Sequence, residues 1–257
     1  MAQGKVIFVS AGPGAADLIT LRGARALQRA DVVLFDALTD PALREFAPNA
    51  LWLDVGKRGF CDSTAQTAIN ALLVKQAQVH AVVVRLKGGD ASIFGRLEEE
   101  LVALAEAGIE SEVVPGVTAA IAAAAHTQRP LTRRGQGRTV ALSTAMTKEG
   151  DLQAMKSADT EVFYMAGRQL GLLARKLQQA GWPADTPALV VSKAGCADAL
   201  SSDHLVADLA AAALLHKGRP TVVTVGAGAR HVAPMRKKAV KSPGLDLAQA
   251  QVITLND

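Results

Sequence analysis

The sequence is poor in cysteine and in aromatic residues. Its two cysteines among 257 residues, Cys61 and Cys196, stand far apart and form no CxxC or Cys/His cluster. This scarcity excludes a disulfide-stapled scaffold, predicts no structural metal site and is typical of a cytoplasmic protein with reduced thiols. Aromatic residues make up only 4% of the chain. Because none of them interleaves with clustered basic residues, we expect no nucleic-acid partner.

Long hydrophobic runs are missing as well. The run at residues 5–9 is soon broken by Gly12, Pro13, Gly14 and Asp17, too early for the apolar region of a signal peptide. The Ala-rich stretch at residues 117–125 is far shorter than the roughly 20 residues that a membrane-spanning helix needs. We therefore expect no membrane partner.

The formal net charge of +4 originates at one end of the chain. Five basic residues cluster near the C-terminus: Arg230, Arg236, Lys237, Lys238 and Lys241. Without them the chain is nearly neutral. The pattern predicts a basic, loosely ordered tail over residues 233–257.

What the sequence does contain is an alternation of short apolar runs with helical patterns. Runs without clean polar alternation predict strands buried on both faces, at residues 6–9, 32–35, 51–55, 81–86, 139–143, 161–165, 188–192 and 221–225. Apolar residues spaced three and four apart predict helices between them, at residues 65–73, 97–105, 168–180 and 204–215.

This alternation favours an α/β fold with mainly parallel sheets covered by helices. The length suits two such domains, which we place at residues 1–116 and 117–232. In sheets of this kind, ligands bind at the carboxyl ends of the strands.

Four loops rich in glycine or small residues follow predicted strands, at residues 10–14, 85–90, 114–119 and 163–167. Glycines let a ligand approach the backbone, and a carboxylate such as Asp90 accepts hydrogen bonds from hydroxyl or ammonium groups. From the residues alone, the first loop is equally well a plain tight turn, and Met165 a core residue. The order and spacing of the loops carry more information than any one of them.

Seven segments occur in the order found in one family: SAGPGAADLITLRGARAL (10–27), DVVLFDAL (31–38), GKR (56–58), VVRLKGGDASIFGR (83–96), EVVPGVTAA (112–120), RPLTRRG (129–135) and EVFYMAGR (161–168). The chain resembles the tetrapyrrole methylases over residues 5–226. Within them it is most similar to the uroporphyrinogen-III C-methyltransferases, because RLKGGD followed by FGR is the most specific segment.

The resemblance implies a homodimer of the class III methyltransferase architecture, with the active site in the cleft between two α/β domains. The cofactor would be S-adenosylmethionine (SAM), which leaves as S-adenosylhomocysteine (SAH), with no metal. The cofactor contacts that the resemblance implies are Pro13, Gly88, Gly89, Asp90, Ile93, Thr118, Ala119, Met165 and Ala194.

The implied reaction converts uroporphyrinogen III to precorrin-2 in sirohaem, cobalamin or haem d1 biosynthesis. Asp36 matches the family's proposed proton acceptor, Lys57 its proposed proton donor, and Arg96 a residue considered for proton removal. The implied contacts to the carboxylate-rich substrate are Arg96, Glu99, Arg133 and Arg134. On the residues alone, a helix cap is the favoured interpretation of Asp36 and a surface ion pair that of Lys57.

The chain departs from the family pattern at Ala37, Leu97, Arg133 and Met146, all expected to face the substrate. Two alternatives therefore stand beside the main interpretation. One is a methylase of another tetrapyrrole. The other is a homologue that binds SAM or a tetrapyrrole with reduced or no turnover.

Overall fold

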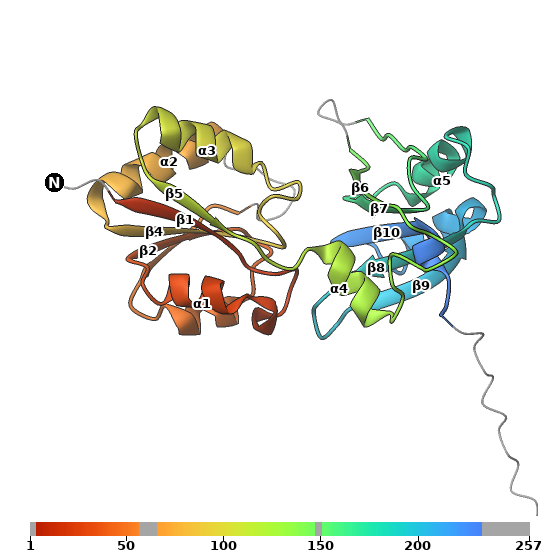
Figure 1. Ribbon diagram of the computed structural model, residues 1–257, viewed down its shortest axis with the longest axis horizontal. Helices are drawn as coiled ribbons and strands as arrows, with labels where there is room; N and C mark the ends of the chain where they lie inside the picture. The colour runs from red at the N-terminus through yellow and green to blue at the C-terminus, as the bar shows by residue number, and fades with distance from the viewer. Residues whose placement is uncertain (1–3, 57–65, 147–150, 233–257) are drawn as a thin grey trace, which may run out of the picture.

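The computed structural model describes residues 4–56, 66–146 and 151–232, which form two α/β domains side by side (Figure 1). The sheet of the first domain contains β1 (Lys5–Ser10), β2 (Val32–Phe35), β3 (Leu51–Asp54), β4 (Val82–Lys87) and β5 (Ser111–Val114). Its strand order is β3-β2-β4-β1-β5, and every pairing is parallel. The carboxyl ends of all five strands therefore lie at one edge of the sheet.

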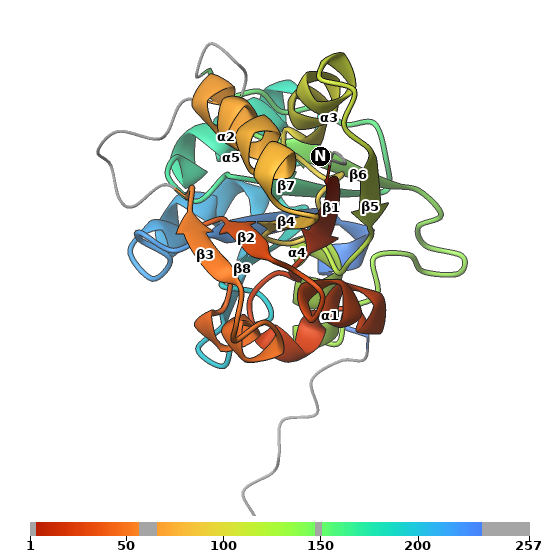
Figure 2. The same ribbon diagram turned by 90° about the vertical axis from the view of Figure 1, so that its left-hand side faces the viewer.

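Helices cover both faces of this sheet (Figure 2). α2 (Gln66–Val79) and α3 (Leu97–Glu106) pack on one face, against a cluster that includes Phe8 and Leu34. α1 (Leu21–Leu27) and the short 3-10 helix η2 (Pro41–Phe46) lie over the other face. Burial on both faces explains why these strands are apolar without alternation.

The second sheet contains β6 (Val140–Thr144), β7 (Thr160–Tyr164), β8 (Pro187–Ser192), β9 (Leu200–Leu205) and β10 (Thr221–Gly226), in the order β6-β7-β10-β8-β9. Here the expectation of a mainly parallel sheet is wrong. Only β6 and β7 pair in parallel, and the other three pairings are antiparallel. The connection from β8 to β9 is too short to hold the crossover that a parallel pair needs.

The helix expected at residues 204–215 is also wrong in part. The segment opens with the end of β9 and continues as a 3-10 helix, η3 (Val206–Ala213). β9 is an edge strand that pairs only with β8, and its sequence LSSDHL is mostly polar. An edge strand of this kind has little apolar pattern to reveal it.

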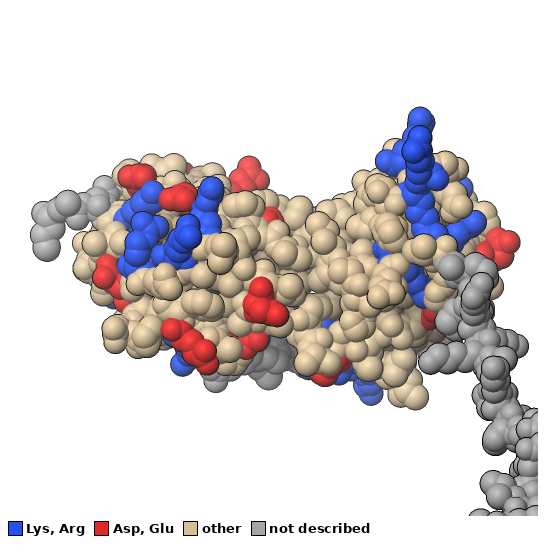
Figure 3. Space-filling view, turned by 60° about the horizontal axis from the view of Figure 1, so that its bottom comes forward, with Lys and Arg blue, Asp and Glu red and all other residues tan. Residues whose placement is uncertain are grey.

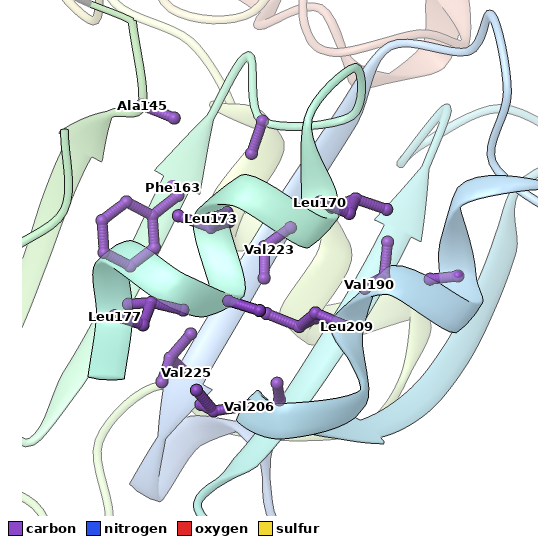
Figure 4. Packing of buried hydrophobic residues seen from close by; sticks show 14 of the residues in the cluster. Ala145, Phe163, Leu170, Leu173, Leu177, Val190, Val206, Leu209, Val223 and Val225 are labelled. Carbon is purple, nitrogen blue, oxygen red and sulfur yellow. The ribbon is translucent and has the colours of Figure 1, made fainter. Parts of the chain in front are cut away.

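Helices also cover both faces of the second sheet. α5 (Leu170–Gln179) presents Leu170, Leu173 and Leu177 to the sheet, beside η3 (Figure 4). On the other face α4 (Ala119–His126) packs through Ala120 and Ala123. Methyl-sized side chains let this helix approach the strands closely.

We propose that the domain boundary lies between residues 116 and 117. The packing of α4 on the second sheet supports this placement. The basic tail expected at residues 233–257 lies outside the described residues. Within the described ranges no helix has both the length and the apolar character needed to cross a membrane.

Candidate functional site

The carboxyl ends of strands from both sheets meet between the two domains (Figure 1). In the second sheet β7 and β8 both run antiparallel to β10, so they point in the same direction and end at one edge. Loops after β1, β4 and β5 face loops after β7 and β8, and hydrogen bonds join them.

Within the first domain three loops are joined directly. Gly12 and Gly89 exchange backbone hydrogen bonds of 3.1 and 2.7 Å, which join the loops after β1 and β4. The Oδ2 atom of Asp90 accepts a 2.8 Å hydrogen bond from the backbone N–H of Gly116, in the loop after β5. Its Oδ1 atom accepts a hydrogen bond from the N–H of Ser92. Asp90 therefore fixes the geometry of two loops.

Further contacts cross from one domain to the other. The N–H of Ala15 donates to the carbonyl of Gly195 at 3.1 Å, in the loop after β8. Within the second domain, the Tyr164 hydroxyl at the end of β7 lies 2.7 Å from Thr118 Oγ1, in the segment that follows β5. Its ring contacts the ring of Phe94, with 5.0 Å between centroids. The five loops thus form one connected surface.

The first and fifth loops approach each other so closely that only glycine fits. A Cβ atom on Gly14 would collide with the Sγ atom of Cys196. Burial raises the pKa of the Cys196 thiol, so this sulfur is a packing group and not an activated nucleophile.

Backbone strain is concentrated on this surface. Four non-glycine residues have positive φ angles here: Phe94 (54°), Arg96 (54°), Met165 (58°) and Lys193 (50°). Such conformations cost about 1–3 kcal/mol each and persist where surrounding structure enforces them, often at ligand sites. Met165 is also 53% exposed, although the residues before and after it are largely buried. The strain and the exposed thioether point to a ligand-binding surface.

The loop after β4 leaves room for a ligand. Gly89 has φ +70°, and nothing lies within 4 Å of the position a Cβ would take, so a ligand has room against the backbone. The structure brings all the expected cofactor residues onto or next to the joined loops, which are Pro13, Gly88, Gly89, Asp90, Ile93, Thr118, Ala119, Met165 and Ala194. Whether each of them contacts SAM stays a prediction.

Asp36 lies at the same edge, directly after β2, and belongs to a buried ionic cluster. Its Oδ1 atom lies 2.6 Å from Arg85 Nη2. Arg85 Nε lies 2.9 Å from Glu100 Oε1, and Lys87 Nζ lies 2.7 Å from Glu100 Oε2. Burial, and then the charge of Arg85, lower the pKa of Lys87 below its ordinary value. We call these four residues the Asp36 cluster.

Arg96 and Glu99 form a second, exposed ion pair at the start of α3. Arg96 Nε and Nη2 each lie 2.7 Å from a Glu99 carboxylate oxygen. The hydrogen bonds to Glu99 raise the pKa of Arg96. A carboxylate-rich ligand at Arg96 would therefore have to compete with Glu99.

Arg133 is not brought together with the joined loops. Its guanidinium donates to the backbone carbonyls of Arg230 and His231, just after β10. Because β10 runs antiparallel to β7 and β8, its carboxyl end lies at the opposite edge of the sheet. Arg134 is the next residue of the same segment, and Lys57 lies outside the described residues.

Figure 3 agrees with this distribution of charge. On the face shown, Lys and Arg side chains gather in two places, one on each domain, and few lie where the domains meet. On this face the described surface between the domains is therefore not strongly basic.

The sequence interpretation missed several members of the site. It assigned no role to Arg85, Lys87 or Glu100, although two charges at alternate positions of an apolar strand place both on one buried face. Within the run Glu98-Glu99-Glu100 it singled out Glu99, whereas Glu100 is the buried residue. The Phe94–Tyr164 contact carries no sequence signal, because it joins two domains.

A profile of the tetrapyrrole (corrin/porphyrin) methylases matches residues 5–210, and the chain belongs to this family.

Among individual relatives, uroporphyrinogen-III C-methyltransferase of Pseudomonas aeruginosa is 45% identical over 196 residues, covering 75% of this chain and 80% of that protein. The protein of the same name from Synechocystis is 37% identical over 245 residues, covering 92% and 93%. The chain spans only 42% of the siroheme synthase 1 of Aeromonas hydrophila, at 44% identity over 74% of this chain.

A solved structure extends the similarity to the fold. The uroporphyrin-III C-methyltransferase of Thermus thermophilus, in complex with S-adenosylhomocysteine, aligns with a TM-score of 0.76 and 32% identity, over 87% of this chain and 97% of that one.

Proposed function

We propose that this protein is a SAM-dependent C-methyltransferase that converts uroporphyrinogen III to precorrin-2. The observation that carries the proposal is the meeting of five strand-end loops from two domains at one strained, glycine-lined surface. The relatives named above, and the SAH-bound structure among them, support this reaction over others.

In this proposal the loops after β1, β4, β5, β7 and β8 hold SAM. When bound, SAM supplies a methyl group that is already activated by its sulfonium, so orientation matters more than further activation. Gly88 and Gly89 leave the backbone accessible, and Thr118 lies beside the Tyr164 hydroxyl. The exposed thioether of Met165 adds a soft, adaptable contact from the second domain.

The charged residues act on the substrate. Methylation of a pyrrole carbon develops positive charge on the ring, and a proton is lost later. A carboxylate at the cleft, Asp36, stabilises that charge or accepts the proton. Lys57 is the proposed proton donor, and Arg96 and Glu99 are the proposed contacts to the substrate. Arg133 and Arg134 stay proposed substrate residues, although a single chain does not bring Arg133 to the joined loops.

The setting of the reaction belongs to the same proposal. The product would feed sirohaem, cobalamin or haem d1 biosynthesis in the cytoplasm, and the protein would act as a homodimer without a metal or a nucleic-acid partner. In the described residues no group of three or more His, Cys, Asp or Glu side chains is arranged to hold a metal ion.

The test is an assay of the purified protein with SAM and enzymatically generated uroporphyrinogen III. We expect release of SAH and a product that oxidises to a coloured, sirohydrochlorin-like species. Intact SAH binding without either signal would contradict the proposed substrate.

A second candidate function is tetrapyrrole or SAM binding with little turnover. Two observations favour it. The Arg96 guanidinium is already paired with the Glu99 carboxylate, and Arg133 lies at the edge of the second sheet opposite to the joined loops. Calorimetry that detects SAH binding, with no methyl transfer to uroporphyrinogen III or to other tetrapyrroles, would support this alternative.

A further inference from the structure

The Asp36 cluster lies at the carboxyl ends of two neighbouring strands. Residues 83, 85 and 87 of β4 share the sheet face that α2 and α3 cover, and Asp36 follows β2, the strand paired with β4. α3 contributes Glu100 from above this face. The sheet register therefore places an acid from β2 beside a base from β4, and the helix closes over them.

Burial makes this arrangement costly. Arg85 is 2% exposed, Lys87 3% and Glu100 0%. Buried ion pairs are often no more stable than apolar residues of similar volume, so stability alone does not account for charges at these positions. With Asp36 ionised, the cluster holds two positive and two negative charges and is neutral as a whole.

Arg85 is held on several sides. Besides Asp36 and Glu100, it donates from Nη1 to the carbonyl oxygens of Leu34 (3.4 Å) and Leu86 (3.2 Å). Glu100 is fixed in turn by Lys87 and by Gln66 Nε2 at 3.3 Å. The guanidinium is therefore a rigid anchor, since a planar donor group bound at several atoms has one orientation.

Asp36 is the member through which the cluster reaches the cleft. Its side chain is 32% exposed, whereas those of the other three are buried. Two residues on, Leu38 packs against Gly88, with its Cβ 3.4 Å from the position a Cβ on that glycine would take. Asp36 is thus anchored by Arg85 and partly exposed, in a segment that packs against the proposed cofactor loop.

We propose that Arg85 is a positioning residue for methyl transfer: held by Glu100, which Lys87 fixes in turn, it orients the Asp36 carboxylate at the carboxyl edge of the first sheet. This inference rests on the proposed function. Arg85 itself touches neither substrate nor cofactor and acts through Asp36. Removing the fork of Arg85 should therefore slow turnover without weakening cofactor binding.

The experiment is a double-mutant cycle with Arg85→Lys, which keeps the charge and removes the fork, Asp36→Asn and the double variant. We expect Arg85→Lys to lower kcat at least about tenfold while the Kd of SAH stays within about twofold. In the Asp36→Asn background, Arg85→Lys should change kcat by less than about twofold, because the group it positions is gone.

A matched control comes from the second domain. Arg129 is also buried and pairs through two nitrogens with Asp203, but it lies beside Ala229 and His231 and away from the joined loops. Arg129→Lys should leave kcat unchanged. If Arg85→Lys fails to fold by circular dichroism, Glu100→Asp, which moves the anchor by one methylene, replaces it with the same expectations.

The outcomes separate the two proposals. A wild-type protein that binds SAH but transfers no methyl group to uroporphyrinogen III defeats the proposed function, and the inference with it. An active wild type in which Arg85→Lys keeps full kcat, or in which the losses from Asp36→Asn and Arg85→Lys multiply, overturns the positioning role alone.

Discussion

The two domains have similar layers of helix and sheet but differ in strand direction and in the side chains that fill their cores. In the first domain all strands are parallel, and the core beneath α3 contains Arg85, Lys87 and Glu100. In the second domain the sheet is mixed, and the cluster beneath α5 and η3 consists of apolar side chains (Figure 4). In the proposed mechanism the first domain supplies the Asp36 carboxylate and most of the cofactor loops, whereas the second domain adds Met165 and the loop after β8 to the cofactor surface.

The largest expected effects are on the free energy of unfolding, when one buried side chain is changed in each domain. Glu100→Gln leaves Arg85 and Lys87 without their shared anion, and we expect a loss of about 3–5 kcal/mol in the free energy of unfolding. Leu177→Ala in the second core should cost about 2–5 kcal/mol through lost burial and a cavity. Urea denaturation measures both.

The two stability losses have different causes, and a second substitution should separate them. Adding Lys87→Met to Glu100→Gln removes one unpaired cation and should recover part of the loss, whereas no charge change should rescue Leu177→Ala. A cost below about 1 kcal/mol for Glu100→Gln would show that water reaches the cluster, against the burial described here.

The next effect is on turnover. Asp36→Asn removes the carboxylate that we propose stabilises the developing charge or takes the proton, and we expect kcat to fall about 100-fold or more. SAH affinity, measured by calorimetry, should stay within about twofold because Asp36 is not a cofactor contact. Full activity in this variant would contradict the acid–base role that we propose for Asp36.

A change in the second domain should show the reverse pattern. Met165→Ala removes the exposed thioether and should weaken SAH binding about tenfold, as loss of one buried apolar contact does. At saturating SAM, kcat should change little. If kcat fell and SAH affinity held, the division of labour between the domains would be wrong.

The smallest expected effect is on pH dependence. Burial, and then the charges of His204 and Arg219, lower the pKa of His216 below 6.5, so the folded state favours its neutral form. Because the unfolded state binds this proton more readily, His216 stabilises the fold above about pH 6.5, and that contribution is lost as the pH falls through the folded pKa. His216→Gln should make the free energy of unfolding depend less on pH between pH 7 and pH 5.

The sequence was informative where the chain obeys local rules. Apolar runs located four of the five parallel strands of the first domain but not β5, and glycine-rich segments located loops that the structure joins. It was least informative where tertiary structure decides. The polar strand β9 and the antiparallel pairings depend on the neighbours that a strand finds.

The same contrast holds for the site. Motif residues such as Gly89 and Met165 lie on the loops that the structure joins, and their contacts to SAM stay a prediction. The buried ion pair of Arg85 with Asp36 depends on the register of β2 against β4, which no single segment reveals. The placement of Arg133 at the far edge depends on the direction of β10.

The contact between Gly14 and Cys196 has a consequence for how this protein can change over evolutionary time. The two residues are far apart in sequence and come from different domains, yet the Sγ atom of Cys196 leaves no space for a Cβ atom on Gly14. A larger residue at position 14 would require a smaller side chain at position 196 and a shift of the backbone at residues 195 and 196, which also lies close to this position. The two halves of the molecule are therefore expected to drift as a matched pair, and chimaeras that combine halves from distant relatives should clash first at this point.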